Sequence, residues 1–272
     1  MPEPPSAPRP GTPWRTPPLL RLTAGVHAAG AAALALSPSS WPLVAAALIA
    51  NHAAVCGTVM TPKSRLLGPN LSRLPPDAKG RVALTFDDGP DPEVTPAVLE
   101  LLAERRARAT FFCIGRRAEE HPELVQEIVA RGHRVENHTY RHPRAFAFYG
   151  PRSQAAEVDR AQDVLEETAG RRPQWFRAPA GFRNVWLGRI LHERGLRLAS
   201  WTRRGYDTVD GNPSRVARRL LSRLSSGDVA LLHDGSVARA PGGRPVVLEV
   251  LPRLLDVVAA RGLSTDFLPA ES

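Results

Sequence analysis

From Arg81 onward, short apolar runs alternate with segments of helical periodicity, and this alternation constrains the fold more than any other feature. In the helical segments, apolar residues recur three and four positions apart. Repeated alternation of strand and helix predicts a parallel sheet, and about seven such units suit an incomplete (β/α) barrel of the α/β class. The strands are expected at Val82–Phe86, Thr110–Ile114, His133–Asn137, Trp175–Phe176, Leu196–Trp201, Val229–Leu232 and Ser264–Leu268.

Composition divides the chain into four parts. Residues 1–18 are crowded with proline and predict a disordered tail. Residues 19–60 are apolar and predict a helical membrane hairpin, and residues 61–79 form a basic, turn-rich segment that predicts a linker. The barrel is expected over residues 80–268.

The hairpin prediction rests on two apolar stretches, Leu22–Leu36 and Leu43–Met60, which are separated by the turn-forming sequence SPSSWP. Each stretch is near the lower length limit for a membrane span. A secretory signal peptide is the alternative, with Arg15 and Arg21 as its basic flank and ALA at positions 33–35 as its cleavage site. Cleavage there would leave the second stretch exposed, so we favour an anchor in a bacterial-type inner membrane, with the side of the barrel left open.

The charge and the cysteines add little to the functional prediction. The net charge is +9 and almost all of the basic residues are arginines, because Lys63 and Lys79 are the only lysines. The arginines are scattered through every segment and match no nucleic-acid-binding motif, so no nucleic-acid partner is expected. Cys56 and Cys113 lie far apart in apolar surroundings, which is typical of buried thiols rather than of a disulfide framework.

Polar clusters follow the predicted strands at the ends where a barrel of this kind carries its chemistry. Each cluster alone has an ordinary explanation as a turn, a cap or a local hydrogen-bonded pair. Together they place ionisable groups on one rim, which a purely structural origin does not predict. The clusters are Asp87 with Asp88, His138 with His142, Arg177 in RAPAG, Asp207 in TRRGYD, and His233 with Asp234.

The two histidines have a spacing typical of metal ligands. Positions i and i+4 put His138 and His142 on one face of a predicted helical turn, which Pro143 ends. With one carboxylate they form a two-His-one-carboxylate site, and such a site keeps positions open for water and substrate. The sequence therefore predicts a catalytic rather than a structural metal centre.

In order and spacing, TFDDGP, HTYRH, RAPAG, a downstream Asp and LLHD resemble the five motifs of the NodB-type polysaccharide deacetylases, carbohydrate esterase family 4. The resemblance covers Gly80 to Leu268, about 70% of the chain. It implies a deformed β/α barrel and the metal-assisted removal of an N- or O-acetyl group from a sugar.

The resemblance also implies a role for each motif residue. Asp88, His138 and His142 would bind one divalent ion, expected to be Zn²⁺, although Co²⁺, Ni²⁺ and Mn²⁺ also suit these ligands. Asp87 would act as the catalytic base. His233 would protonate the leaving amine.

Supporting roles follow from the same resemblance. Arg177 would orient Asp87, and Asp207 would pair with either Arg177 or His233. A backbone N–H near Ala180 would stabilise the oxyanion, and the substrate-binding set is Ala180, Gly181 and Leu231, with Leu231 at the acetyl methyl group.

The substrate is the least defined part of the prediction. Family members commonly have an aromatic residue where this chain has Ala180, and a Trp where it has Thr208, so two walls of the sugar groove are lost. The expected substrate is an acetylated amino sugar of a cell-envelope glycan such as peptidoglycan or a chitin-like oligosaccharide. The alternatives are a deacetylase or deformylase of a lipid-linked amino sugar, and an inactive relative that only binds glycan.

Overall fold

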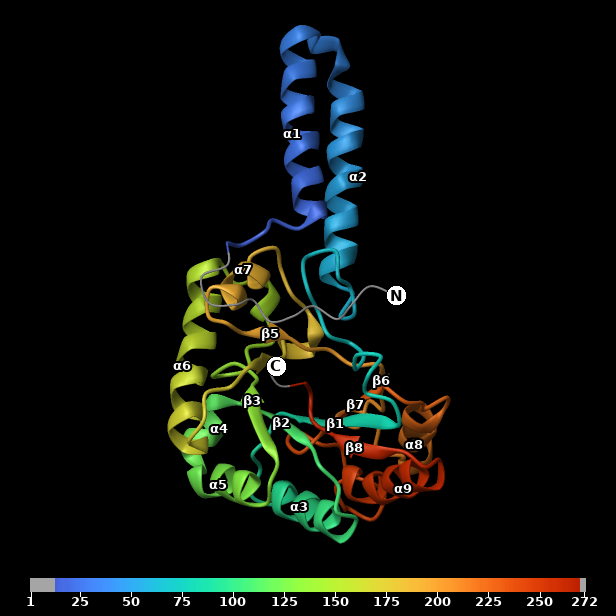
Figure 1. Cartoon of the computed structure of the whole chain (residues 1–272). Helices are drawn as coiled ribbons and strands as arrows, with labels where there is room; N and C mark the ends of the chain where they lie inside the picture. Colours follow the sequence, from blue (N-terminus) through green and yellow to red (C-terminus); the bar gives the residue numbers. More distant parts are fainter. Residues whose placement is uncertain (1–12, 270–272) are drawn as a thin grey trace.

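The computed structural model describes residues 13–269 and contains a β/α barrel with a long helical hairpin standing away from it (Figure 1). Residues 1–12 of the predicted tail lie outside the described residues. The strands are β1 (Arg81–Asp87), β2 (Thr110–Cys113), β3 (Arg134–Asn137), β4 (Trp175–Phe176), β5 (Arg197–Leu198), β6 (Arg203–Arg204), β7 (Val229–His233) and β8 (Ser264–Asp266). The helices are α1 (Pro18–Leu36), α2 (Trp41–Val59), α3 (Val94–Glu104), α4 (Gly115–Glu120), α5 (Pro122–Ala130), α6 (Pro151–Ala169), α7 (Leu187–His192), α8 (Pro213–Leu221) and α9 (Val247–Ala260).

All strand pairs are parallel, and the sheet order is β5-β4-β3-β2-β1-β7-β6, with β8 paired to the start of β1. The sheet confirms the predicted incomplete barrel. Each predicted strand is present within a few residues of its expected bounds. The two-residue strand β6 was not predicted, because Arg203 and Arg204 carry no apolar pattern.

The central strand β1 determines where the core lies. Residues Val82 to Phe86 are fully buried because side chains of a parallel strand are covered on both faces. Val82, Leu84 and Phe86 pack outward against the surrounding helices, whereas Ala83 belongs to the cluster inside the barrel. Figure 1 shows α3, α5, α6 and α9 around the outside of the sheet. The strand thereby delivers Asp87 to the rim.

Residues 61–79, here called the strap, lie across the opening between the two ends of the sheet. Leu71 forms a parallel bridge with Ala199 after β5, and Arg73 forms an antiparallel bridge with Asp228 before β7. The Leu71 N–H donates to the Leu198 carbonyl oxygen at 2.9 Å. An unpaired sheet edge leaves backbone groups without partners, and the strap supplies some of them. The segment that the sequence predicts as a linker is thus packed against the barrel.

The hairpin consists of α1 and α2, which run antiparallel (Figure 1). Thr23 donates a hydrogen bond to Asn51 at 3.1 Å, and the His27 and His52 rings lie 5.2 Å apart, so the polar residues face the partner helix. Most of the other side chains are exposed. Both helices are long and apolar enough to cross a membrane, a property that signal sequences share.

The packing of the strap generates a stability prediction. Leu71 is 3% exposed and Leu66 is 57% exposed, although both belong to the strap. We expect Leu71→Ala to lower the free energy of unfolding by about 2–5 kcal/mol, the usual cost of truncating a buried leucine. The matched control Leu66→Ala should change it by no more than about 0.5 kcal/mol.

Urea unfolding of the detergent-solubilised chain, followed by circular dichroism, measures both values. Equal effects of the two substitutions would show that the strap contributes nothing to the folded barrel.

Candidate metal and catalytic site

The C-terminal ends of the strands bring the predicted site residues to one cavity of about 430 Å³. Asp87 ends β1, His233 ends β7, and His138 directly follows β3. The cavity is lined by Asp87, Asp88, His138, His142, Arg144, Ala180, Gly181, Trp201, Arg204, Thr208, Val209, Leu231, His233 and Ser236. Arg177 and Asp207 are fully buried directly behind this lining.

Asp88, His138 and His142 form the one group of His, Cys, Asp or Glu in residues 13–269 whose ligand atoms could hold a metal ion. These atoms lie within 4.8 Å of one another. The Oδ1 atom of Asp88 is 3.3 Å from Nε2 of His138 and 3.4 Å from Nε2 of His142. It is buried and accepts no hydrogen bond. A buried carboxylate oxygen without a donor is costly, so a cation between the three groups fits the site.

The histidine pair is not on a helical turn, and that prediction is wrong. Residues 138–142 form a loop in which Thr139 and His142 have positive φ angles of 67° and 54°. The Asn137 side chain accepts a hydrogen bond from the Thr139 N–H at 2.8 Å, and the Thr139 hydroxyl accepts one from the His142 N–H at 3.0 Å. These side-chain acceptors replace the helical backbone pattern and still bring both imidazoles to Asp88.

A hydrogen bond fixes the orientation of His138. Its Nδ1 lies 2.8 Å from the backbone carbonyl oxygen of Arg177, so Nδ1 carries the proton and Nε2 faces Asp88 with a lone pair when the ring is neutral. Ligating histidines generally have such a partner on the second nitrogen.

The charges at the triad favour a bound cation. Burial, together with the neighbouring His138, lowers the pKa of His142 to about 4. Although burial opposes ionisation of Asp88, its close contact with His138 and its charge interactions with the nearby histidines lower the pKa of its carboxyl. Burial lowers the pKa of His138, but the Asp87 and Asp88 carboxylates outweigh it and raise that pKa. The two carboxylates therefore attract positive charge to this position, which a metal ion can supply as well as a proton.

Sequence reasoning missed two residues that hold Asp88 in place. Asp88 has φ 74°, and its backbone carbonyl accepts a hydrogen bond from Nη1 of Arg117 at 2.9 Å. A Cβ at Gly235 would lie 2.4 Å from the same carbonyl oxygen, so only glycine allows this approach. Neither residue belongs to a motif that marks this function.

Arg177 and Asp87 form a buried ion pair. Nη1 of Arg177 donates to Oδ1 of Asp87 at 2.6 Å and to the Thr85 hydroxyl at 2.8 Å. Nη2 donates to the Ser200 carbonyl oxygen at 3.0 Å. The guanidinium carbon lies 4.1 Å from the centre of the Phe112 ring. These contacts fix one Asp87 oxygen and leave Oδ2 on the side of His138, 3.8 Å from its Nε2.

Asp207 pairs with His233 and not with Arg177, the other partner that the sequence left open. Its Oδ1 accepts from Nδ1 of His233 at 2.8 Å, and its Oδ2 accepts from the His233 backbone N–H at 2.8 Å. Burial lowers the pKa of His233, but the Asp207 carboxylate and the Asp87 and Asp88 charges outweigh it and raise that pKa to about 9. His233 is thus held as an imidazolium at neutral pH.

The predicted substrate residues Ala180, Gly181 and Leu231 all line the cavity. Ala180 has φ 54° within the short 3-10 turn Pro179–Gly181. The structure adds Trp201, Arg144 and Arg204, which sequence reasoning did not select. Arg144 lies two residues after His142, and Trp201 ends a predicted strand, but neither position carries a distinctive motif.

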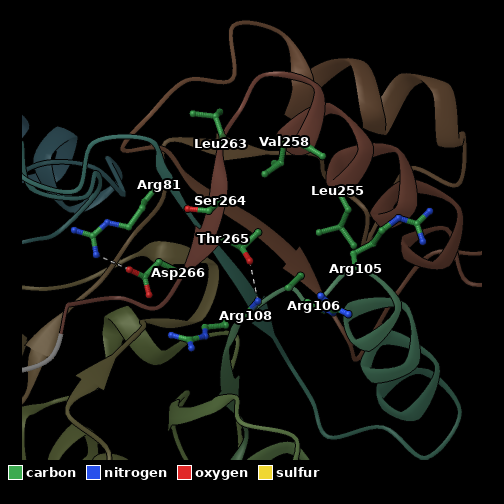
Figure 2. Close-up of a pocket in the computed structure, with 12 residues that line it drawn as sticks. Arg81, Arg105, Arg106, Arg108, Leu255, Val258, Leu263, Ser264, Thr265 and Asp266 are labelled. Carbon is green, nitrogen blue, oxygen red and sulfur yellow. Dashed lines mark hydrogen bonds and ion pairs between the residues drawn. The ribbon is translucent and has the colours of Figure 1, made fainter.

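A second cavity, of about 460 Å³, lies at the start of β1 beside β8 and is larger than the first (Figure 2). Figure 2 shows the guanidinium groups of Arg81, Arg105, Arg106 and Arg108 pointing in different directions. Arg81 pairs with Asp266 at 2.7 Å. Because the cavity holds no convergent ligand set, the chemistry belongs to the smaller cavity at the other ends of the strands.

Comparison with known proteins agrees with this geometry. The family model described as polysaccharide deacetylase matches residues 75–199. A chitooligosaccharide deacetylase of Azorhizobium caulinodans is 35% identical over 195 residues, which cover 69% of this chain and 92% of the relative. A peptidoglycan-N-acetylglucosamine deacetylase of Bacillus cereus is 34% identical over 172 residues, or 61% of this chain and 78% of the relative.

A solved structure shows the same fold at similar identity. The family 4 carbohydrate esterase from Streptomyces lividans, in complex with acetate, is 31% identical with a TM-score of 0.63, and the match covers 70% of this chain and 93% of that one. The resemblance seen in the motifs is therefore confirmed over the barrel. The chain belongs to the polysaccharide deacetylase family, the family 4 carbohydrate esterases.

Proposed function

We propose that this chain hydrolyses the N-acetyl group of an amino sugar in a cell-envelope glycan, releasing acetate and leaving a free amine. The observation that carries the proposal is one cavity containing Asp87 beside the Asp88, His138 and His142 triad, with His233 also in its lining. The relatives named for chitooligosaccharide and peptidoglycan N-acetylglucosamine support the substrate class.

Asp88, His138 and His142 would hold a divalent ion, which we propose to be Zn²⁺. When bound, such an ion supplies Lewis-acid chemistry for a carbonyl group and for water. Two imidazoles and one carboxylate are a common ligand set of catalytic zinc, whereas Co²⁺, Ni²⁺ and Mn²⁺ accept the same groups.

Asp87 acts as the general base. Its Oδ1 is engaged by Arg177 at 2.6 Å, so Oδ2 is the oxygen that takes the proton from the attacking water. The water oxygen then forms a bond to the acetyl carbon. A backbone N–H near Ala180 donates to the oxygen that becomes negative in this step.

His233 acts as the general acid. Its Nδ1 is bound to Asp207 at 2.8 Å, so Nε2 carries the proton that it can transfer. The bond between the acetyl carbon and the nitrogen breaks, its electron pair stays on nitrogen, and His233 protonates the amine. Leu231, buried in the cavity lining, offers an apolar contact for the acetyl methyl group.

The ligand assignment predicts a specific loss of metal. We expect one equivalent of zinc in the dialysed full chain and at least about tenfold weaker binding in His142→Ala, because loss of even an outer partner of a ligand costs about 10–100-fold. His121→Ala is the matched control, since His121 contacts Glu123 and lies outside the cavity. Elemental analysis measures both, and undiminished zinc in His142→Ala would refute the ligand set.

The base assignment predicts loss of turnover without loss of metal. Asp87→Asn should lower acetate release from N-acetylchitooligosaccharides by about 10²- to 10⁴-fold, because an amide cannot accept the proton. Zinc content should stay at one equivalent, and the exposed control Asp163→Asn should keep full activity. If Asp87→Asn retains more than about a tenth of the wild-type rate, another group is the base.

The acid assignment predicts a shift in the pH profile. His233 must be protonated to act, and the Asp207 carboxylate holds its pKa high, so activity should persist to alkaline pH. In Asp207→Asn that pKa falls, and the alkaline limb of kcat/KM therefore moves to lower pH while the acid limb remains. An alkaline limb at the wild-type pH in this variant would remove His233 from the role of acid.

A further inference from the structure

The two segments that join the hairpin to the rest of the chain, here called its first leg (residues 13–17, before α1) and its second leg (residues 60–63, after α2), both contact the barrel. Before α1, the Trp14 ring lies 5.4 Å from the His192 ring, and a Cβ at Gly188 would be 3.0 Å from Trp14. Pro17 is also buried. The first leg therefore packs on α7, and this contact restrains the orientation of the hairpin relative to the barrel.

After α2, the second leg is held by hydrogen bonds. The Pro62 carbonyl oxygen accepts from the Asn70 amide at 2.8 Å and from the Ser200 hydroxyl at 3.0 Å. Nζ of Lys63 donates to the Thr202 carbonyl oxygen at 3.0 Å. With both legs fixed, the direction of the hairpin relative to the barrel is set.

The base of the hairpin lies beside the catalytic cavity. A Cβ at Gly181 would be 2.7 Å from Cβ of Pro62 and 2.5 Å from the Trp201 ring. Gly181 and Trp201 line the cavity, and Pro62 is three residues beyond Val59, where α2 ends. Three residues span at most about 10 Å, so the cavity wall lies within about that distance of the end of α2.

A lipid bilayer is the occupant that fits the hairpin surface. Each helix has 19 residues and is about 28 Å long, close to the roughly 30 Å of a hydrocarbon core. Large apolar side chains point outward along it, including Ile49 at 70% exposure. Its far end, SPSSWP, is uncharged. The basic residues Arg15, Arg21, Lys63 and Arg65 all stand at the base, where anionic headgroups would lie.

The cavity itself contains two cations without a carboxylate partner. Arg144 and Arg204 line it, and neither forms an ion pair with any residue in 13–269. The Arg204 guanidinium lies 4.8 Å from the Tyr206 ring, and its Nε is buried with no acceptor. Arginine is well suited to phosphate because its planar donors match the phosphate oxygens. These two arginines can therefore bind an anionic group beside the residues that we propose to act on the acetyl group.

We propose that the site deacetylates an N-acetyl amino sugar joined through phosphate to a membrane lipid, an inference that rests on the proposed function. The hairpin places the cavity at the bilayer surface, and Arg144 with Arg204 receives the phosphate. Confinement to the same surface raises the effective substrate concentration to about the millimolar range. That gain replaces the affinity that aromatic groove walls give to polymer substrates.

The test uses the full chain reconstituted into phosphatidylcholine–phosphatidylglycerol vesicles, with acetate release as the readout. Three probes share one sugar: N-acetylglucosamine 1-phosphate esterified to a prenyl alcohol in the vesicle, soluble N-acetylglucosamine 1-phosphate, and soluble methyl N-acetylglucosaminide. We expect kcat/KM to fall in that order. The lipid-linked probe should exceed the soluble phosphate by at least about 100-fold, and the phosphate should exceed the glycoside by about 10- to 100-fold.

Two substitutions separate the contributions. Ile49→Arg puts a charge midway along α2 and should remove the preference for the lipid-linked probe, while activity on the soluble phosphate is retained and reports correct folding. Its matched control is Ile49→Leu. Arg204→Gln should remove the preference for phosphate, whereas Arg106→Gln, which changes an arginine of the second cavity, should preserve it.

The outcomes distinguish this inference from the proposed function. Equal kcat/KM for the lipid-linked and soluble phosphates, or a preference that survives Ile49→Arg, would overturn the membrane-borne substrate. If soluble chitooligosaccharides are deacetylated with a rate that rises steeply with chain length and the lipid-linked probe is not, this inference fails and the proposed function stands. If no probe, chitooligosaccharides included, releases acetate, both fail.

Discussion

The buried ion pair between Arg177 and Asp87 is the constraint on which the site depends. Arg177 is fully buried, and its guanidinium links Asp87 and Thr85 of β1 to the Ser200 carbonyl. Its own carbonyl orients His138. Removing one partner of a buried ion pair commonly lowers the free energy of unfolding by about 3–5 kcal/mol. The folded barrel therefore depends on Arg177 and Asp87 meeting in this geometry. The same contacts that complete the fold set the direction of the base and of one metal-binding imidazole.

Ser200 extends this network to the strap that follows the helical hairpin. Its hydroxyl donates to Pro62 in the strap and also approaches Asn70 at 3.2 Å, while its carbonyl accepts from Arg177. The strap therefore connects the hairpin and the catalytic residues through side chains and backbone groups that are already needed for packing. This arrangement couples the position of the hairpin to the wall of the catalytic cavity.

The fold and the site followed from the sequence in unequal measure. The strands were predictable because β1 and β7 are mostly apolar runs that end in Asp87 and His233, and parallel strands place such ends on one rim. The histidine loop was not predictable, because a spacing of four residues fits a helix equally well, and the hydrogen bonds to the Asn137 and Thr139 side chains that favour the loop leave no mark in that spacing. The strap was predicted as a linker because it is rich in turn-forming residues such as proline and glycine, and this composition does not reveal that several of its leucines are buried against the barrel. Arg117 gave no signal, because it acts on a backbone carbonyl.

The central claim is that acetate release requires one cation held by Asp88, His138 and His142, with Asp87 beside it as the base. Titration of the metal-stripped full chain with Zn²⁺, with acetate release from an N-acetylated amino sugar followed at each addition, tests it most directly. The account predicts a rise from almost no activity to a plateau at one equivalent. Two results would contradict it: activity in the metal-stripped protein equal to that at the plateau, or a plateau that is reached only when more than one equivalent of Zn²⁺ per chain is bound.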